Sequence, residues 1–418
     1  MIRWSISRTV LLSGALFGLL CSCSLPVNAA TFVNPIVKNG QDPWLIYHEG
    51  YYYYCGSSGN ASSMWIFVSK ARRLQGIGAV PAVRVWTPPS GTAYSKEIWA
   101  PELHYLDGKW YIYFAADDGN NANHRMYVLE GNTQDPQSSY TFKGQLKPTT
   151  DYWAIDGTVL TLGGQKFFLW SGHSTAYPSS APNVQNLYIA QMSSPLTIVG
   201  DRYLLSEPRH DWESERDRSR SWSINEGPEV LTKGDRIHII YSANGAWTED
   251  YCLGQLTYSS GDVLKQGSWT KKATPVFSKT ASIFGPGHAS FVKSPDGAED
   301  WIVYHSKISR EPGWPRQVSA QKFTWEANGD PVFGSPVALG IPIQEPSDTT
   351  QIVTTTGAST RSGTSSVTST TVLSTLTTQQ STSSLSEGVF MIVAVVLVVS
   401  SAVSLTVYRR RHKRNEKR

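Results

Sequence analysis

Alternating apolar and polar positions, interrupted by glycine turns, recur through most of the chain and predict short β-strands. The stretch "KEIWAPELHYLDGKWYIYFAADD", residues 96–118, shows the pattern once: a mixed apolar run, an Asp-Gly pair, and an aromatic run that ends in small residues. An Asp-Gly pair between two such runs is typical of a tight β-hairpin turn. The segment therefore predicts one hairpin, and its wider meaning depends on whether the pattern recurs.

The same unit occurs five times. Its turn glycines lie roughly 55 to 70 residues apart and are Gly50, Gly108, Gly164, Gly234 and Gly297. A four-stranded propeller blade needs about 40 to 50 residues plus its loops. The repeat predicts an all-β fold, a five-bladed β-propeller over residues 31–346. The alternative is a set of hairpins in a large β-sandwich, a fold that does not usually repeat one turn and its flanks five times.

Acidic residues precede three of these turns at the same spacing. Counting back eight positions from the glycines gives Asp42, Ala100, Asp156, Glu226 and Ala289, with Glu102 close to the second and His288 next to the fifth. The first strand of each propeller blade lines the central channel, so equivalent positions converge there. Three gathered carboxylates cost repulsion and desolvation, which indicates a functional site rather than a stabilising one.

Three carboxyl groups on a rigid ring suit the cleavage of a glycosidic bond. One acid must keep its proton for the leaving oxygen, and another must be ionised to activate water from the opposite face. A third can orient the acid and raise its pKa. The 15 Trp and 20 Tyr residues offer apolar faces for sugars. Taken singly, Asp42 and Asp156 also suit ordinary turns, and Glu229 is a second acid beside Glu226 outside the register.

Other motifs have two interpretations each. His288 in "FGPGHASF" is either a core histidine or a group that binds water or a metal ion in the channel. Arg316, after "SREPGWP", either binds sugar hydroxyls or a carboxylate, or is a surface arginine. The charged run at 208–222 is a solvated loop or a rim of the cleft. The sequon at 60–62 predicts glycosylation.

The N-terminus has the pattern of a secretory signal peptide over residues 1–29: a basic start, an apolar run and the small-residue end "VNAA". Two cysteines, Cys55 and Cys252, remain after its removal, which excludes a disulfide-stapled scaffold. They either pair or lie separately as buried thiols.

Three compositions follow one another at the C-terminus. Residues 347–386 are rich in Ser and Thr and predict a disordered, O-glycosylated stalk. Residues 389–407 form an uncharged run of membrane-spanning length and predict a transmembrane helix. The basic residues 408–418 predict a cytosolic tail. Much of the formal net charge of +4 lies there, so nothing suggests nucleic-acid binding. Together, the N-terminal and C-terminal segments predict a cell-surface, single-pass type I membrane protein with an extracellular catalytic domain.

Five motifs, in order, carry a family resemblance: "NGQDPW", "WAPELHYLDGKWYIYFAA", "AIDGTVL", "NEGPEVL" and "GPGHASF". Over residues 32–346 the chain resembles glycoside hydrolase family 43, five-bladed propellers that remove arabinose or xylose from plant polysaccharides with inversion. By this resemblance Asp42 matches the general base and Glu226 the general acid. Asp156 matches the residue that orients the acid and tunes its pKa.

The resemblance also implies substrate contacts. Trp99, in the "WAPE" motif, matches part of the sugar-binding wall, and Glu102 and Arg316 are expected near the substrate. His288 matches the axial histidine near which many members hold calcium, so calcium or another ion is expected in the channel, although no cofactor is required.

The segments "NLYIAQM" and "DYCLGQLTY" are most similar to α-L-arabinofuranosidases. The expected function is that of an inverting, exo-acting hydrolase that releases terminal α-L-arabinofuranose from arabinan or arabinose-substituted plant polysaccharides. The alternatives are a β-xylosidase or an endo-arabinanase of the same family, and a catalytically inactive, membrane-tethered carbohydrate receptor. The presence of all three acids weighs against the receptor.

Overall fold

The computed structural model describes residues 30–57, 64–177, 183–214 and 222–348. The chain divides into two compact units, Met1–Thr355 and Thr356–Arg418, and every described residue belongs to the first. The fold below is therefore that of the first unit alone.

Five groups of four antiparallel strands follow one another along the chain, and a short parallel pairing joins the third and fourth groups into one eight-stranded sheet. Blade 1 contains β2 (Gln41–His48), β3 (Tyr51–Ser57), β4 (Ile66–Ala71) and β5 (Val83–Trp86). Blade 2 contains β6 (Lys96–Leu106), β7 (Lys109–Asp117), β8 (Arg125–Gly131) and β9 (Tyr140–Gln145). Blade 3 contains β10 (Ala154–Leu162), β11 (Gln165–Gly172), β12 (Asn183–Ser194) and β13 (Thr197–Ser206).

Blade 4 contains β14 (Trp222–Lys233), β15 (Arg236–Ala243), β16 (Cys252–Tyr258) and β17 (Trp269–Lys271). Blade 5 contains β18 (Phe284–Lys293), β19 (Asp300–Lys307), β20 (Arg316–Trp325) and β21 (Pro331–Val332). Four short 3-10 helices lie in connections: η1 (Leu74–Gly76), η2 (Asn121–Asn123), η3 (Asp211–Glu213) and η4 (Gln266–Ser268).

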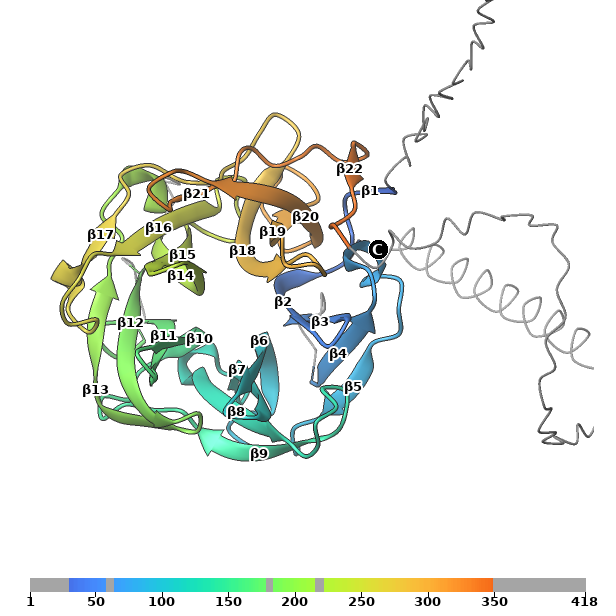
Figure 1. The fold of residues 1–418 in the computed structure, drawn as a ribbon. Helices are drawn as coiled ribbons and strands as arrows, with labels where there is room; N and C mark the ends of the chain where they lie inside the picture. The colour runs from blue at the N-terminus through green and yellow to red at the C-terminus, as the bar shows by residue number, and fades with distance from the viewer. Residues whose placement is uncertain (1–29, 58–63, 178–182, 215–221, 349–418) are drawn as a thin grey trace, which may run out of the picture. The chain divides into compact units, whose positions relative to one another are not determined.

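The blades form a ring, and the first strand of each lies nearest its middle (Figure 1). The ring is closed where the two ends of the unit meet, because β1 (Thr31–Val33) pairs with β22 (Pro342–Gln344). The backbone N–H groups of Ile36 and Val37 also donate to the carbonyl of Val318 in blade 5, at 2.8 and 3.2 Å. This arrangement agrees with the predicted five-bladed propeller.

The predicted hairpin in blade 2 is confirmed. Leu106 pairs with Lys109 across a two-residue turn, so only Asp107 and Gly108 connect the strands. Both turn residues have positive φ, 50° and 78°. That backbone matches the twist of the flanking strands, and an Asp-Gly pair adopts it at low cost.

The hydrophobic core is divided into five clusters, and each lies between two consecutive blades. Tyr53 and Val68 of blade 1 share a cluster with Ile112 of blade 2. Phe32 and Val303 pack in the cluster that joins blades 5 and 1, across the closure. Because each blade buries both faces against its neighbours, strands such as β7 are buried along almost their whole length. A two-layer sandwich would bury only one face of each sheet.

One part of the fold prediction is wrong. Among the described residues, no helix has the length and apolar character needed to cross a membrane, and the predicted transmembrane helix is not retained. The segment given for it, 389–407, lies outside the described residues. The same is true of the signal peptide at 1–29, the sequon at 60–62, the tail at 408–418 and all but the first two residues of the stalk. Cys55 and Cys252 are both free and buried.

Candidate active site

A β-bulge interrupts the first strand of every blade at the same point, opposite the second strand. The first bulge residue has positive φ in all five cases: Asp42 (51°), Ala100 (40°), Asp156 (54°), Gly227 (50°) and His288 (46°). Residues other than glycine adopt this backbone rarely, and bulges re-aim side chains next to active sites. Two of the predicted acids and the predicted histidine therefore occupy equivalent, strained positions on the inner strands.

Glu226 lies one residue before the first bulge residue of blade 4. Counting back eight residues from the turn glycine therefore does not reach the bulge position in this blade. The turn there joins Lys233 to Arg236 and places its glycine first, as Gly234-Asp235, rather than second. In blade 5 the connection from Lys293 to Asp300 is longer, and the count reaches Ala289 instead of His288. The repeat located the right segments, but the turn geometry decided the exact residue.

Nitrogen groups surround the carboxylate of Asp42, whose side chain is 13% exposed. Its Oδ1 lies 3.3 Å from Arg316 Nη1, 3.4 Å from His288 Nδ1 and 3.3 Å from His305 Nδ1. Burial alone would raise the pKa of this carboxyl, but the neighbouring His288 and the Arg316 guanidinium outweigh it and hold the pKa well below its usual value. Asp42 is therefore ionised at neutral pH.

Glu226 has the opposite environment. Burial raises its pKa to about 7, while a hydrogen bond from Tyr251 and the charge of Arg316 oppose the rise and the charge of Asp42 adds to it. The Tyr251 hydroxyl donates to Glu226 Oε1 at 2.7 Å. Glu226 is therefore largely protonated just below neutral pH.

Asp156 is tied to the same strand as Glu226. Its Oδ2 accepts a hydrogen bond from the backbone N–H of Gly227 at 3.1 Å. Burial raises the pKa of Asp156, and the negative charges of Glu226 and Asp42 raise it further. The protonated form of Asp156 is therefore favoured, beside an ionised Asp42.

Two residues without a predicted role join this group. The rings of Tyr251 and His305 stack at 5.4 Å with an interplanar angle of 12°. His305 Nδ1 accepts a hydrogen bond from the backbone N–H of Asp42 at 3.1 Å. Tyr251 thus stacks on His305, which contacts Asp42, and also donates a hydrogen bond to Glu226. Gly287 leaves room for it, because a Cβ there would lie 2.4 Å from the Tyr251 ring.

The predicted substrate contacts separate into two sets. Arg316 lies within the group, on Asp42. Trp99 is half-buried and stacks on His124, with ring centroids 3.9 Å apart. Glu102 instead bonds His104 Nε2 at 2.8 Å. It also faces the buried Glu229, whose pKa is raised by burial and by Glu102. Glu102 thus contacts His104 and a second buried acid, and its charge also contributes to the raised pKa of Asp156.

The predicted channel ion fits poorly. His288 is of a residue type that can bind a metal, and burial lowers its pKa while the charge of Asp42 opposes that shift. Within the described part of the chain, however, the cluster of three such ligands is Glu97, Asp117 and His124, which does not include His288. No step is derived through an ion at His288, and hydrolysis by two carboxyl groups requires none.

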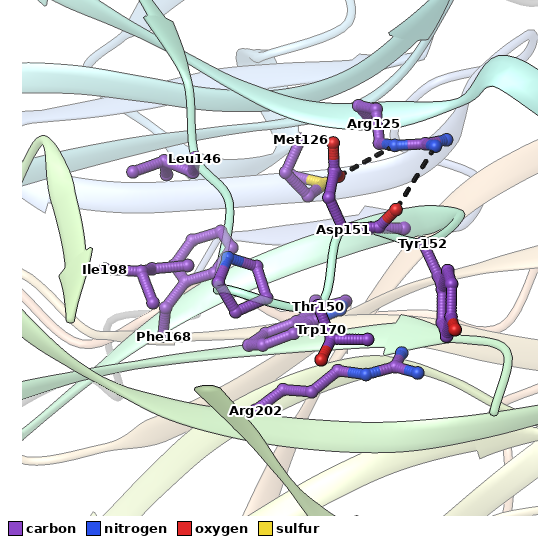
Figure 2. Close-up of a pocket in the computed structure, with 12 residues that line it drawn as sticks. Arg125, Met126, Leu146, Thr150, Asp151, Tyr152, Phe168, Trp170, Ile198 and Arg202 are labelled. Atoms are coloured by element: carbon purple, nitrogen blue, oxygen red, sulfur yellow. Dashed lines mark hydrogen bonds and ion pairs between the residues drawn. The ribbon is translucent and has the colours of Figure 1, made fainter. Parts of the chain in front are cut away.

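A separate small pocket lies between blades 2 and 3 (Figure 2). Arg125 Nε contacts Asp151 Oδ1 there at 2.9 Å, and Phe168, Trp170 and Arg202 also line it. None of the predicted site residues lines this pocket, and no group in it combines an ionised with a protonated acid. It is not a candidate for the chemistry.

Similarity to known proteins supports the same assignment of the fold. The model of glycosyl hydrolases family 43 matches residues 32–331. An extracellular exo-alpha-(1->5)-L-arabinofuranosidase of Streptomyces avermitilis is 37% identical over 75% of this chain and 65% of its own length. A protein of the same name from Streptomyces chartreusis is 32% identical over 73% of this chain and 93% of its own.

Among solved structures, an alpha-L-arabinofuranosidase from Lactobacillus brevis superimposes with a TM-score of 0.67 at 34% identity, over 74% of this chain and 98% of that one. The chain spans somewhat less than two thirds of the Streptomyces avermitilis protein. The family match covers most of the chain and the whole ring of five blades, so the chain belongs to glycoside hydrolase family 43.

Proposed function

We propose that the chain is an exo-acting α-L-arabinofuranosidase, which releases terminal α-L-arabinofuranose from arabinan or arabinose-substituted plant polysaccharides. One observation carries the proposal: a single buried group holds one carboxyl with a lowered pKa, Asp42, and one with a raised pKa, Glu226. Such a pair supplies a base and an acid at the same pH. The arabinofuranosidase names of the relatives favour arabinose as the sugar.

In the proposed reaction, Asp42 is the general base. It takes a proton from a water molecule, whose oxygen attacks the anomeric carbon of the terminal sugar. Glu226 gives its proton to the glycosidic oxygen as that carbon–oxygen bond breaks. The attack comes from the face opposite the leaving group, so the product is inverted, and solvent restores both protonation states. An inverting pair of carboxyls stands about 6.5–9.5 Å apart to admit the water.

The neighbouring residues prepare these two groups. Arg316 favours the ionised form of Asp42. Asp156 accepts a hydrogen bond from the backbone N–H that follows Glu226 and so helps to hold that part of the strand in place. Tyr251 donates a hydrogen bond to Oε1 of Glu226. Trp99 is assigned to the wall of the sugar site.

A product assay tests the proposal. The chain is incubated with linear α-1,5-arabinan, arabinotriose and xylobiose, and the products are separated by chromatography. The proposal predicts that arabinose is the first product from the arabinan polymer, that arabinotriose gives arabinose and arabinobiose, and that no xylose is released. Early release of arabinobiose and longer oligosaccharides from the polymer would instead indicate an endo-acting enzyme, as in the name of two relatives, probable arabinan endo-1,5-alpha-L-arabinosidase C, which are 30% identical over 43% of this chain. Xylose release would indicate a β-xylosidase, and binding without turnover a carbohydrate receptor.

We further propose that the protein acts outside the cell. Two relatives are named extracellular, and residues 1–29 have the pattern of a secretory signal. N-terminal sequencing of the mature protein would test this, with a start near residue 30 as the expected result.

A further inference from the structure

We infer that three tryptophans, Trp222, Trp247 and Trp314, bind the sugar residues on the leaving side of the cleaved bond. They are called the tryptophan platform below. The inference rests on the proposed function, since it assigns the aglycone part of the same arabino-oligosaccharide. None of the three belongs to the motifs that identify the catalytic acids.

The three rings are contiguous. Trp247 lies between the other two, with ring centroids 5.6 Å from Trp222 and 5.7 Å from Trp314. Trp314 is 61% exposed, the largest value among the large hydrophobic side chains of the described residues. Trp222 and Trp247 are half-exposed. Contiguous apolar side chains that reach the surface in this way often mark an interaction site.

The platform is continuous with the candidate active site. The guanidinium of Arg316 stands over the Trp314 ring, 5.2 Å from its centroid, and its Nη1 contacts Asp42 at 3.3 Å. At the other end, Trp222 begins β14, the strand that carries Glu226. At one end of the platform, the Arg316 side chain connects Trp314 to the proposed base, Asp42. At the other end, Trp222 lies four residues before the proposed acid, Glu226, in the sequence.

Its position matches the direction in which the leaving group departs. Glu226 gives its proton to the leaving oxygen, so the aglycone must lie on the side of this acid. Trp222 and Trp247 both belong to blade 4, the blade that carries Glu226. Trp99, assigned to the wall around the sugar that is released, belongs to blade 2.

Hydrogen bonds hold the platform rigid. The N–H of Gly313 donates to the carbonyl of Trp247 at 2.9 Å, which joins the loop before β20 to the loop after β15. Lys307 Nζ donates to the carbonyl of Gly313 at 2.7 Å, and Arg310 Nε contacts Glu249 Oε2 at 3.1 Å. A preformed surface loses little conformational freedom on binding, so its contacts contribute more of their energy to affinity. Indole faces suit the apolar C–H face of a sugar.

Two substrates separate this role from a contribution to the chemistry. α-L-Arabinofuranosyl fluoride contains the sugar that is released but no sugar on the leaving side, whereas α-1,5-arabinotriose occupies both sides. In Trp314→Ala, we expect kcat/KM for arabinotriose to fall about three- to tenfold, the value of one lost aromatic contact. Hydrolysis of the fluoride should remain within about twofold of the wild-type rate. Trp247→Ala should show the same pattern.

The control is Tyr203→Ala, since Tyr203 is also an exposed aromatic residue (47%) but lies on the outer strand β13. Circular dichroism and the melting temperature establish that each variant is folded. An equal loss on both substrates would overturn the inference, because Trp314 would then act through Arg316 on the chemistry. Unchanged arabinotriose hydrolysis in both tryptophan variants would also overturn it. Failure of the wild-type chain to hydrolyse either substrate would contradict the proposed function itself.

Discussion

Two carboxyl groups of the same kind behave differently here because of what surrounds them. Asp42 faces Arg316 and two histidines, whereas Glu226 is buried and accepts a hydrogen bond from a tyrosine hydroxyl. The charge state of Asp42 is thus set by neighbours from blade 5, and that of Glu226 by burial, by Tyr251 of its own blade and by Arg316 of blade 5. A residue motif alone contains no information on these neighbours.

Replacement of Glu226 tests the role of the acid. Glu226→Gln keeps the size and the hydrogen bond from Tyr251 but has no proton of suitable acidity. We expect kcat for arabinotriose to fall about 10²- to 10⁴-fold, since that is what a general acid contributes. Arabinofuranosyl fluoride, whose leaving group needs little protonation, should lose much less.

Glu326→Gln is the matched control, because Glu326 is exposed and lies far along the chain in a surface turn of blade 5. Equal losses of Glu226→Gln on both substrates would remove Glu226 from the role of general acid. Native circular dichroism should be retained in both variants.

Replacement of Tyr251 tests what sets the pKa of the proposed acid, Glu226. Activity needs Glu226 protonated and Asp42 ionised, so kcat/KM should be level at mildly acidic pH and fall as pH rises through about 7. The bond from Tyr251 lowers the pKa of Glu226, so its loss in Tyr251→Phe should raise that pKa. The basic limb of the pH profile should therefore move to higher pH. A limb that stays in place or moves to lower pH would contradict the assigned contact.

At the scale of the elements, the bulged inner strand is the unit that builds the site. The sequence predicted the repeat, the hairpins and the segments that hold the acids. A short turn that contains glycine, between two β-prone runs, can be recognised from the local sequence alone. It did not predict the bulge, which depends on pairing with the second strand. For this reason the count from the turn glycine assigns Glu226 to the same position as Asp42 and Asp156, although Glu226 precedes the first residue of the bulge.

His305 illustrates what the repeat contained but did not reveal. The residue opposite the start of the bulge is small in four blades, namely Ser57, Ala115, Ser171 and Ser242. In blade 5 the same position is His305. This exception at one position of the repeat is the sequence signal that could have identified His305. Tyr251 gave none, since its partners are 25 and 54 residues away in sequence.

Gly287 tests how tightly this element is packed. In Gly287→Ala the new Cβ would lie 2.4 Å from the Tyr251 ring, so the ring must shift away from Glu226. Overpacking of this kind typically costs about 1–3 kcal/mol of the free energy of unfolding. We expect a lower urea midpoint together with reduced activity on arabinotriose. Gly267→Ala is the control, because nothing lies within 4 Å of a Cβ there. Unchanged activity in Gly287→Ala would contradict the packing of Tyr251 described here.

At the scale of the whole ring, the five blades bury their faces against one another, and the ring is closed by the N-terminal segment. Asn34 is central to this closure: its side chain donates to the carbonyl of Ala320 at 3.0 Å and accepts from the N–H of the same residue at 2.9 Å. Five repeats in the sequence predicted the ring, but the residues that close it lie outside the repeat and gave no signal.

Asn34→Ala would leave both backbone groups of Ala320 without these partners in a buried place. The expected loss is about 1–3 kcal/mol of the free energy of unfolding, measured by urea denaturation. Asn132→Ala, which removes an exposed bond to Ser139, should cost far less. Equal stability of the two variants would show that the N-terminal segment does not hold the ring closed.

The central claim is that Asp42 and Glu226 act as base and acid from opposite faces of the sugar. The most direct measurement is proton NMR of the first arabinose released from arabinotriose, before the product's anomers interconvert. The account predicts β-L-arabinofuranose, the inverted anomer. First release of the α anomer would show a retaining reaction and would contradict the assignment of these two residues.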